Sequence, residues 1–337
     1  MSRRAVGGLL ALVGVLLLGA CEPSTPSGEK ADPNAAVNGA LDAFAAQTAI
    51  AYRVGADTLN VTRAGLVQGT LSLQDQQVGV LRAGGALYLR APSQYWQAQG
   101  MQGDRAAEYG ARWSRSVLPF ELGSLAPADV VRTLRGAVSA TTPAERLVLA
   151  DGTDVFDVGG LRVTARQPYR VVSIDPTLLG PVAAQALGTT PVTVHAVTDL
   201  PALQAAFGQS SHDLGQPFVA GPVIATTVSA NNLTCTAGGS CTDVVRVENR
   251  LIGDAPAASA RLVLKSAVTS AQLGAQECGQ ELVAPLNDSA TMTCSVRFTL
   301  PKLTGSAKVA AVPTVTAEPV AVVDPAAVDR EVATELG

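Results

Sequence analysis

Residues 78–92 read "VGVLRAGGALYLRAP" and place two apolar runs on either side of Gly84 and Gly85. A two-residue hairpin turn requires positive φ angles, which glycine adopts without a steric penalty. The stretch therefore predicts an antiparallel β-hairpin. A second glycine pair, Gly159-Gly160 in "VFDVGGLRVTARQPYRVVSIDP", repeats the arrangement and predicts a second hairpin.

The segments around the first hairpin extend this pattern. Residues 49–55 ("AIAYRVG") and 66–74 ("LVQGTLSLQ") alternate apolar and polar side chains, as a strand with one buried face requires. Residues 92–101 ("PSQYWQAQGM") and 127–138 ("PADVVRTLRGAV") each begin with proline and predict helices. We therefore expect an α+β N-terminal domain, in which a curved antiparallel sheet carries helices on one face.

The C-terminal third has a different pattern. Residues 223–252 and 260–300 consist of short strand-like runs separated by Gly, Asn, Asp and Pro, without a helical periodicity. This spacing is typical of a β-sandwich. The runs "DVVRVENR" and "ATMTCSVRF" resemble strands of the Ig-like or CARDB-like modules of bacterial surface proteins. We expect an all-β sandwich over residues 218–312.

Four of the five cysteines lie in this second domain, and four cysteines allow three pairings. We expect the local pairs Cys235–Cys241 and Cys278–Cys294. A zinc site is the alternative. The spacings are wider than those of zinc knuckles, no histidine lies nearby in the sequence, and export favours oxidation. Disulfides are therefore the preferred interpretation, and no metal or other cofactor is expected.

The fifth cysteine, Cys21, directly follows an export signal. A basic start is followed by an apolar stretch too short to span a bilayer, and then by "LGAC". This ending resembles the lipobox of bacterial lipoproteins, which implies that a diacylglyceryl group on Cys21 anchors the mature chain to the cell membrane, facing outwards. The alternative is an ordinary secretory signal followed by a chance cysteine.

Breaks in composition divide the rest of the chain. After the signal peptide (1–20), residues 21–38 carry Pro, Ser and Gly without an apolar periodicity and predict a flexible tether. A polar break at 208–217 separates a first domain (39–207) from a second (218–312). Residues 313–337 are rich in Pro and Ala and predict a loosely held tail.

Charge and motifs exclude several functions. Removal of the signal peptide leaves 22 of the 24 basic side chains against 28 acidic ones, a net charge of −6, so nucleic acid is not an expected partner. No phosphate-binding loop, dinucleotide fingerprint, nucleophile elbow or zinc-protease motif occurs. His212 and Asp213 lie in the polar break, and Asp151, Asp154 and Asp157 have turn spacing. We expect no enzymatic activity.

The stretch from "VTRAGLVQGTLSLQ" to "APSQYW", with "ARWSRS", "LAPADVVRTL" and "YRVVSID" after it, resembles the actinobacterial lipoproteins of the LppX and LprG kind, and more remotely the LolA-like envelope carriers. The resemblance covers residues 45–200. It implies a half-barrel of antiparallel strands under helices, with acyl chains held between them.

Such a carrier needs an apolar cavity lined by the inward side chains of the sheet and by the adjacent tryptophan. The candidates are Ile50, Tyr52, Leu71, Leu73, Leu87, Leu89, Trp96, Leu161 and Val163. The alternative is that the same residues form a closed core, because protein interiors normally pack without voids. Two functions therefore remain: a lipoprotein that binds or carries an acyl chain or other apolar envelope ligand, or a surface protein whose β-sandwich binds protein or polysaccharide.

Overall fold

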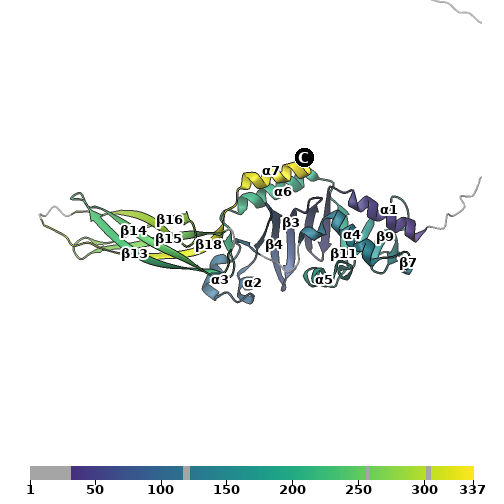
Figure 1. Cartoon of the computed structure of the whole chain (residues 1–337), viewed down its shortest axis with the longest axis horizontal. Helices are drawn as coiled ribbons and strands as arrows, with labels where there is room; N and C mark the ends of the chain where they lie inside the picture. The colour runs from purple at the N-terminus through teal and green to yellow at the C-terminus, as the bar shows by residue number, and fades with distance from the viewer. Residues whose placement is uncertain (1–31, 117–121, 256–257, 301–304) are drawn as a thin grey trace, which may run out of the picture.

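The computed structural model describes residues 32–116, 122–255, 258–300 and 305–337. The chain has a mixed α+β fold with one fifteen-stranded sheet and a separate three-stranded sheet. Figure 1 shows an elongated molecule, with most helices at one end and the long strands β13 to β18 at the other. We call residues 32–213 the N-terminal part and residues 218–321 the C-terminal part.

The N-terminal part of the large sheet runs in the order β6-β5-β4-β3-β2-β1-β11-β10-β9-β8-β7, and each of these ladders is antiparallel. Its strands are β1 (Ala49–Val54), β2 (Asp57–Thr62), β3 (Val67–Leu73), β4 (Gln76–Ala83), β5 (Ala86–Arg90), β6 (Trp113–Arg115), β7 (Ala144–Val148), β8 (Asp154–Val158), β9 (Leu161–Thr164), β10 (Val171–Ile174) and β11 (Val192–Ala196).

Both predicted hairpins are present. Gly84 and Gly85 join β4 to β5 with φ angles of 59° and 69°, and Gly159 and Gly160 join β8 to β9 with 62° and 96°. A side chain at these positions would be strained, because residues other than glycine rarely adopt positive φ. The two glycine pairs therefore set the register of the two hairpins.

Seven helices accompany the sheets in the described residues: α1 (Pro33–Ala45), α2 (Ser93–Ala98), α3 (Gly103–Tyr109), α4 (Pro127–Ala137), α5 (Pro181–Leu187), α6 (Leu200–Asp213) and α7 (Pro325–Leu336). Helices α2 and α4 confirm the two predicted ones. Helix α1 begins inside the predicted tether, because the Asp32 carboxylate caps it by accepting a hydrogen bond from the Asn34 N–H and Pro33 occupies its first turn. Residues 33–38 are therefore helical, which corrects the C-terminal end of the tether.

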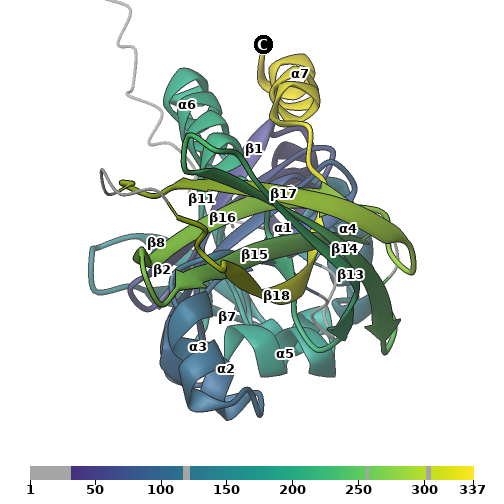
Figure 2. The same ribbon diagram turned by 90° about the vertical axis from the view of Figure 1, so that its left-hand side faces the viewer.

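Helices cover both faces of the large sheet, which corrects the expectation of one covered face. Val80 packs with α1, α2 and α4 in one core, while its neighbour Leu81 packs with α6 and α7 in a second core. Successive side chains of a strand point to opposite faces, so the two cores lie on opposite sides of β4. Figure 2 shows α6 and α7 on one side and α2, α3 and α5 on the other.

The C-terminal part consists of long strands, and its helix-free pattern agrees with the sequence. The order β13-β14-β17 forms the three-stranded sheet, and β16-β15-β18 forms the end of the large sheet. A shared core of Val245, Val247, Leu262, Leu264 and Met292 joins the two. The strands are β12 (Phe218–Val219), β13 (Val223–Cys235), β14 (Ser240–Ile252), β15 (Ala258–Ser270), β16 (Gly274–Ala284), β17 (Ser289–Arg297) and β18 (Ala310–Ala321).

The prediction of a loose tail over 313–337 is wrong. Strand β18 pairs with β15 along most of its length, and α7 buries Val328, Val332 and Leu336 against the second core. One edge of β18 pairs with β15, and the opposite edge pairs with β12 only at Val320. Pro313 lies seven residues before Val320, so it needs no backbone N–H for pairing along that opposite edge, and proline is tolerated there. The tail therefore crosses from the C-terminal part back to the N-terminal part.

Candidate functional site

The nine side chains expected to line a ligand cavity lie in the first hydrophobic core. Leu73 and Leu87 are half-buried and pack against this core, and the other seven have at most 2% of their surface exposed. Those seven are Ile50, Tyr52, Leu71, Leu89, Trp96, Leu161 and Val163. The sheet and its helices thus meet directly at these positions.

The polar atoms of the two aromatic members are satisfied inside the protein. The Tyr52 hydroxyl donates a hydrogen bond to the carbonyl oxygen of Leu125 at 2.6 Å, and burial raises the pKa of Tyr52 well above its ordinary value. Trp96 donates from Nε1 to the Ala91 carbonyl oxygen at 3.2 Å and meets the Phe218 ring edge-on at 5.1 Å. The side chains of Tyr52 and Trp96 therefore stabilise the packed core.

A groove lies beside this core, where α1 crosses strands that separate. β10 and β11 pair only through Ser173↔Thr193 and Ile174↔Val192. The residues that would form the next pairs of the ladder, Val172 with Val194 and Val171 with His195, instead line a hollow of about 460 Å³. We call it the α1 groove; it is lined by Ala40, Ala43, Phe44, Gln47, Ile50, Leu149, Asp151, Thr153, Thr164, Arg170, Val171, Val172, Thr193, Val194, His195, Ala196 and Thr198.

The α1 groove has an apolar interior and a polar rim. Phe44, Val171 and Val194 are at most 7% exposed and belong to the first core. At the rim, the Thr153 N–H donates to the Asp151 carboxylate at 2.9 Å and lowers the pKa of Asp151. Burial, and then the nearby Arg53 guanidinium, lower the pKa of His195, which favours the neutral imidazole at neutral pH.

Of the nine predicted residues, only Ile50 lines the α1 groove. The sequence analysis does not predict the groove, because it expects no helix over residues 33–45, and α1 contributes Ala40, Ala43 and Phe44 to the lining. A sequence signal was present: Ala36, Ala40 and Phe44 recur at helical spacing and are all buried. The divergence of β10 from β11 has no comparable sequence signal.

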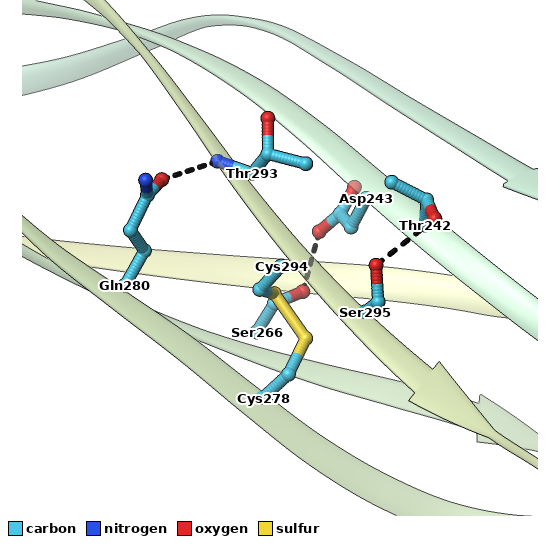
Figure 3. The surroundings of a disulfide bond; sticks show 8 residues. All are labelled: Thr242, Asp243, Ser266, Cys278, Gln280, Thr293, Cys294 and Ser295. Carbon is cyan, nitrogen blue, oxygen red and sulfur yellow. Dashed lines mark hydrogen bonds between the residues drawn. A yellow bond between two sulfur atoms is a disulfide. The ribbon is translucent and has the colours of Figure 1, made fainter.

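Both predicted disulfides are present. Cys235 and Cys241 are directly paired residues of β13 and β14, while Cys278 of β16 and Cys294 of β17 join the two sheets. Figure 3 shows the second disulfide beside a hydrogen bond between Ser266 and Asp243.

That hydrogen bond is a second link between the two sheets. The Ser266 hydroxyl donates to Oδ2 of Asp243 at 2.5 Å, and both residues are at most 1% exposed. Oδ1 of Asp243 has no hydrogen-bond partner among the described residues. The disulfide and this buried polar pair therefore cross the same interior.

The His212–Asp213 pair makes surface contacts at the end of α6. Nε2 of His212 lies 3.4 Å from Oδ2 of Asp329 on α7, and Asp213 accepts a hydrogen bond from Gln209. Within the described ranges, no three His, Cys, Asp or Glu side chains are arranged to hold a metal ion. His212 and Asp213 therefore have contacts typical of an exposed helix end.

Cys21 lies outside the described residues, so the anchor remains a prediction. In the part of the chain that the structure describes, no helix combines the length and the apolar character needed to cross a membrane. Comparison with protein-family models, curated proteins and solved structures finds no match. The candidate site is thus defined by its own geometry.

Proposed function

We propose that this chain is a membrane-anchored bacterial lipoprotein that binds an acyl chain or another apolar envelope ligand in the α1 groove. In this proposal the N-terminal part is a half-barrel domain of the LppX/LprG-like kind, and the C-terminal part is an Ig-like β-sandwich. The observation that carries the proposal is the groove itself. Its volume of about 460 Å³ lies within the range of ~300–1,000 Å³ typical of ligand pockets.

The chemistry of the groove favours an apolar chain. Each buried CH₂ group contributes ~0.8 kcal/mol, so an alkyl chain gains affinity from Phe44, Val171 and Val194 without polar contacts. At the rim, the carboxylate of Asp151 and the guanidinium of Arg170 offset each other in charge. Selectivity among ligands would therefore arise at the rim and affinity in the interior.

The position of the groove suits a lipid-anchored protein. Helix α1 forms one wall and begins at Pro33, twelve residues after Cys21. An extended segment from Cys21 to Ala31 spans at most ~40 Å, which keeps the groove near the membrane surface. Figure 1 shows α1 at the end of the molecule opposite the long strands β13 to β17.

The anchor is tested by Cys21→Ser. We expect this variant to leave the membrane fraction or to accumulate as unprocessed precursor, because the thioether to diacylglycerol cannot form on serine. Fractionation followed by N-terminal sequencing measures both outcomes. Membrane attachment of a normally trimmed Cys21→Ser chain would show that another feature anchors the protein.

Ligand binding is tested by Ala43→Phe, which places a phenyl ring at a half-buried position lining the groove. We expect the affinity for a fluorescent fatty acid to fall at least tenfold, with a change in unfolding free energy below ~1 kcal/mol, because the ring occupies empty space. The control is Ala35→Phe, at an exposed position on the same helix. Equal binding by wild type and Ala43→Phe would exclude the groove as the ligand site.

A second candidate is a cell-surface interaction protein whose C-terminal part binds protein or polysaccharide, with no internal ligand. The close packing of the nine core residues favours this second candidate, because a carrier similar to LppX or LprG would hold its acyl chain between the sheet and the helices, where these residues lie. Titration of the wild-type chain with a fluorescent fatty acid distinguishes the two, because the interaction protein should bind none. Val163→Phe should cost ~1–3 kcal/mol of stability under either candidate, because Val163 lies in a filled core.

A further inference from the structure

A second groove lies where the N-terminal and C-terminal parts of the molecule meet. It has a volume of about 680 Å³ and receives residues from α3, β5, β6 and the end of α6 on one side, and from β15 and β16 on the other. We call it the junction groove; it is lined by Arg90, Glu108, Ala111, Arg112, Trp113, Asp213, Leu214, Gln216, Arg261 and Glu281.

A fixed ion-pair network supports the groove. The side chain of Glu318 is only 9% exposed and accepts from Arg112 at 2.8 Å and from Arg261 at 2.6 Å. Arg261 also forms two hydrogen bonds to Glu281, at 2.6 and 2.7 Å. The Arg112 guanidinium lies over the Tyr109 ring at 5.1 Å. Because these contacts join the two parts of the molecule, the walls of the groove are held in place before any ligand arrives.

Other groups of the groove are paired only loosely. Arg90 lies 3.7 Å from Oδ2 of Asp213, whose Oδ1 accepts from Gln209, and Glu108 lies 3.9 Å from Arg112, which already donates to Glu318. Both separations exceed the ~3.2 Å limit of a good N–H···O hydrogen bond, so Arg90, Glu108 and Oδ2 of Asp213 retain capacity to bind a ligand. The Arg90 guanidinium also covers the Trp113 ring at 5.1 Å, and the buried Nε1 of Trp113 has no hydrogen-bond partner among the described residues.

The charges of the groove indicate the chemistry of its ligand. Three arginines and three carboxylates line it, so its formal charge is zero. An anion would face the three carboxylates and a cation the three arginines. An apolar ligand would remove charged groups from water without compensating hydrogen bonds, which is costly. A neutral ligand with many hydroxyl groups can both donate to the carboxylates and accept from the guanidinium groups.

We propose that the junction groove binds a neutral carbohydrate chain. This site is separate from the α1 groove and does not depend on the anchor. The ligand is either a soluble oligosaccharide or a strand of a neutral envelope polysaccharide, and the two share the hydroxyl pattern that the groove recognises. Groups of both parts of the molecule contact the ligand, so neither part alone forms the whole site.

The experiment is calorimetric titration of the full mature chain with maltohexaose, cellohexaose and chitotetraose, together with co-sedimentation with delipidated neutral wall polysaccharide. We expect at least one of these probes to bind, and we expect Arg90→Ala and Asp213→Asn to weaken that binding at least tenfold. Both residues are half-exposed, so the substitutions leave the fold intact. The control is Arg132→Ala, which removes an exposed arginine paired on α4.

The outcomes separate the sources of the ligand and test the site. Binding of an oligosaccharide indicates a soluble source, and co-sedimentation alone indicates the polymer. The inference fails if no probe binds at millimolar concentration, if Arg90→Ala and Asp213→Asn bind as the wild type does, or if inorganic phosphate displaces the sugar. Fatty-acid binding in the α1 groove should be equal in all four proteins, which keeps this test independent of the proposed function.

Discussion

Deletion of residues 325–337 is expected to destabilise the N-terminal part by about 5 kcal/mol, since burial of each large aliphatic side chain contributes ~1.5–3 kcal/mol. The deletion removes Val328, Val332 and Leu336, which are 2–6% exposed. It also removes the carboxylate of Glu331, which accepts a hydrogen bond from the Gly84 N–H at 2.7 Å. Domains of this size are stable by only ~5–15 kcal/mol, so the loss is a large fraction of the total.

Urea denaturation followed by tryptophan fluorescence measures this effect, because Trp113 belongs to the core under α6 and α7. Arg330→Ala is the matched control: its side chain is on the same helix, 72% exposed and only loosely paired with Asp324 at 3.7 Å. We expect the control to unfold at the wild-type midpoint. A deletion variant with an unchanged midpoint would mean that α7 adds nothing to the fold.

Replacement of both Cys278 and Cys294 by alanine is expected to cost about 3 kcal/mol and to unfold the C-terminal part preferentially. A disulfide stabilises the fold mainly by restricting the unfolded chain, and this bond closes a loop with a sequence separation of 16. It is also the covalent link between β16 and β17, which belong to different sheets.

The paired control is replacement of Cys235 and Cys241. These residues are six apart, and loop-closure entropy for such a short loop gives about 2 kcal/mol. They also face each other in the ladder of β13 and β14, which keeps the two strands paired without the bond. Peptide mapping without reductant should first show both bonds in the mature protein. Hydrogen exchange then reports which strands lose protection. Equal losses in the two variants, or loss centred on β1 to β5, would contradict the role assigned to the inter-sheet bond.

Local signals predicted the elements whose conformation is decided within a few residues. The glycine pairs at 84–85 and 159–160 require positive φ and therefore determine two hairpins. The cysteine spacing similarly predicted both disulfides, because each pair bridges neighbouring strands. Alternation in residues 49–55 and 66–74 correctly placed Ile50 and Leu71 in the interior.

Features that depend on distant parts of the chain were not predicted. Helix α7 is stabilised by α6 and by Leu81, more than a hundred residues away, and its Pro- and Ala-rich composition indicates a tail when read alone. The α1 groove depends on the point at which β10 and β11 stop pairing. Packing against other elements of the fold sets that point, so neither strand's own sequence predicts it. The junction groove needs Glu318 of β18 between Arg112 and Arg261, and no local pattern brings these three together.

The most direct measurement is native mass spectrometry of the full chain, extracted in mild detergent from a bacterial host that processes lipoproteins. We expect a polypeptide that begins at Cys21, carries a covalent diacylglyceryl group and retains one further non-covalent lipid. Ala43→Phe should keep the covalent group and lose the non-covalent lipid. A wild-type chain without bound lipid, giving the same spectrum as Ala43→Phe, would contradict the assignment of this protein as a lipid-binding lipoprotein.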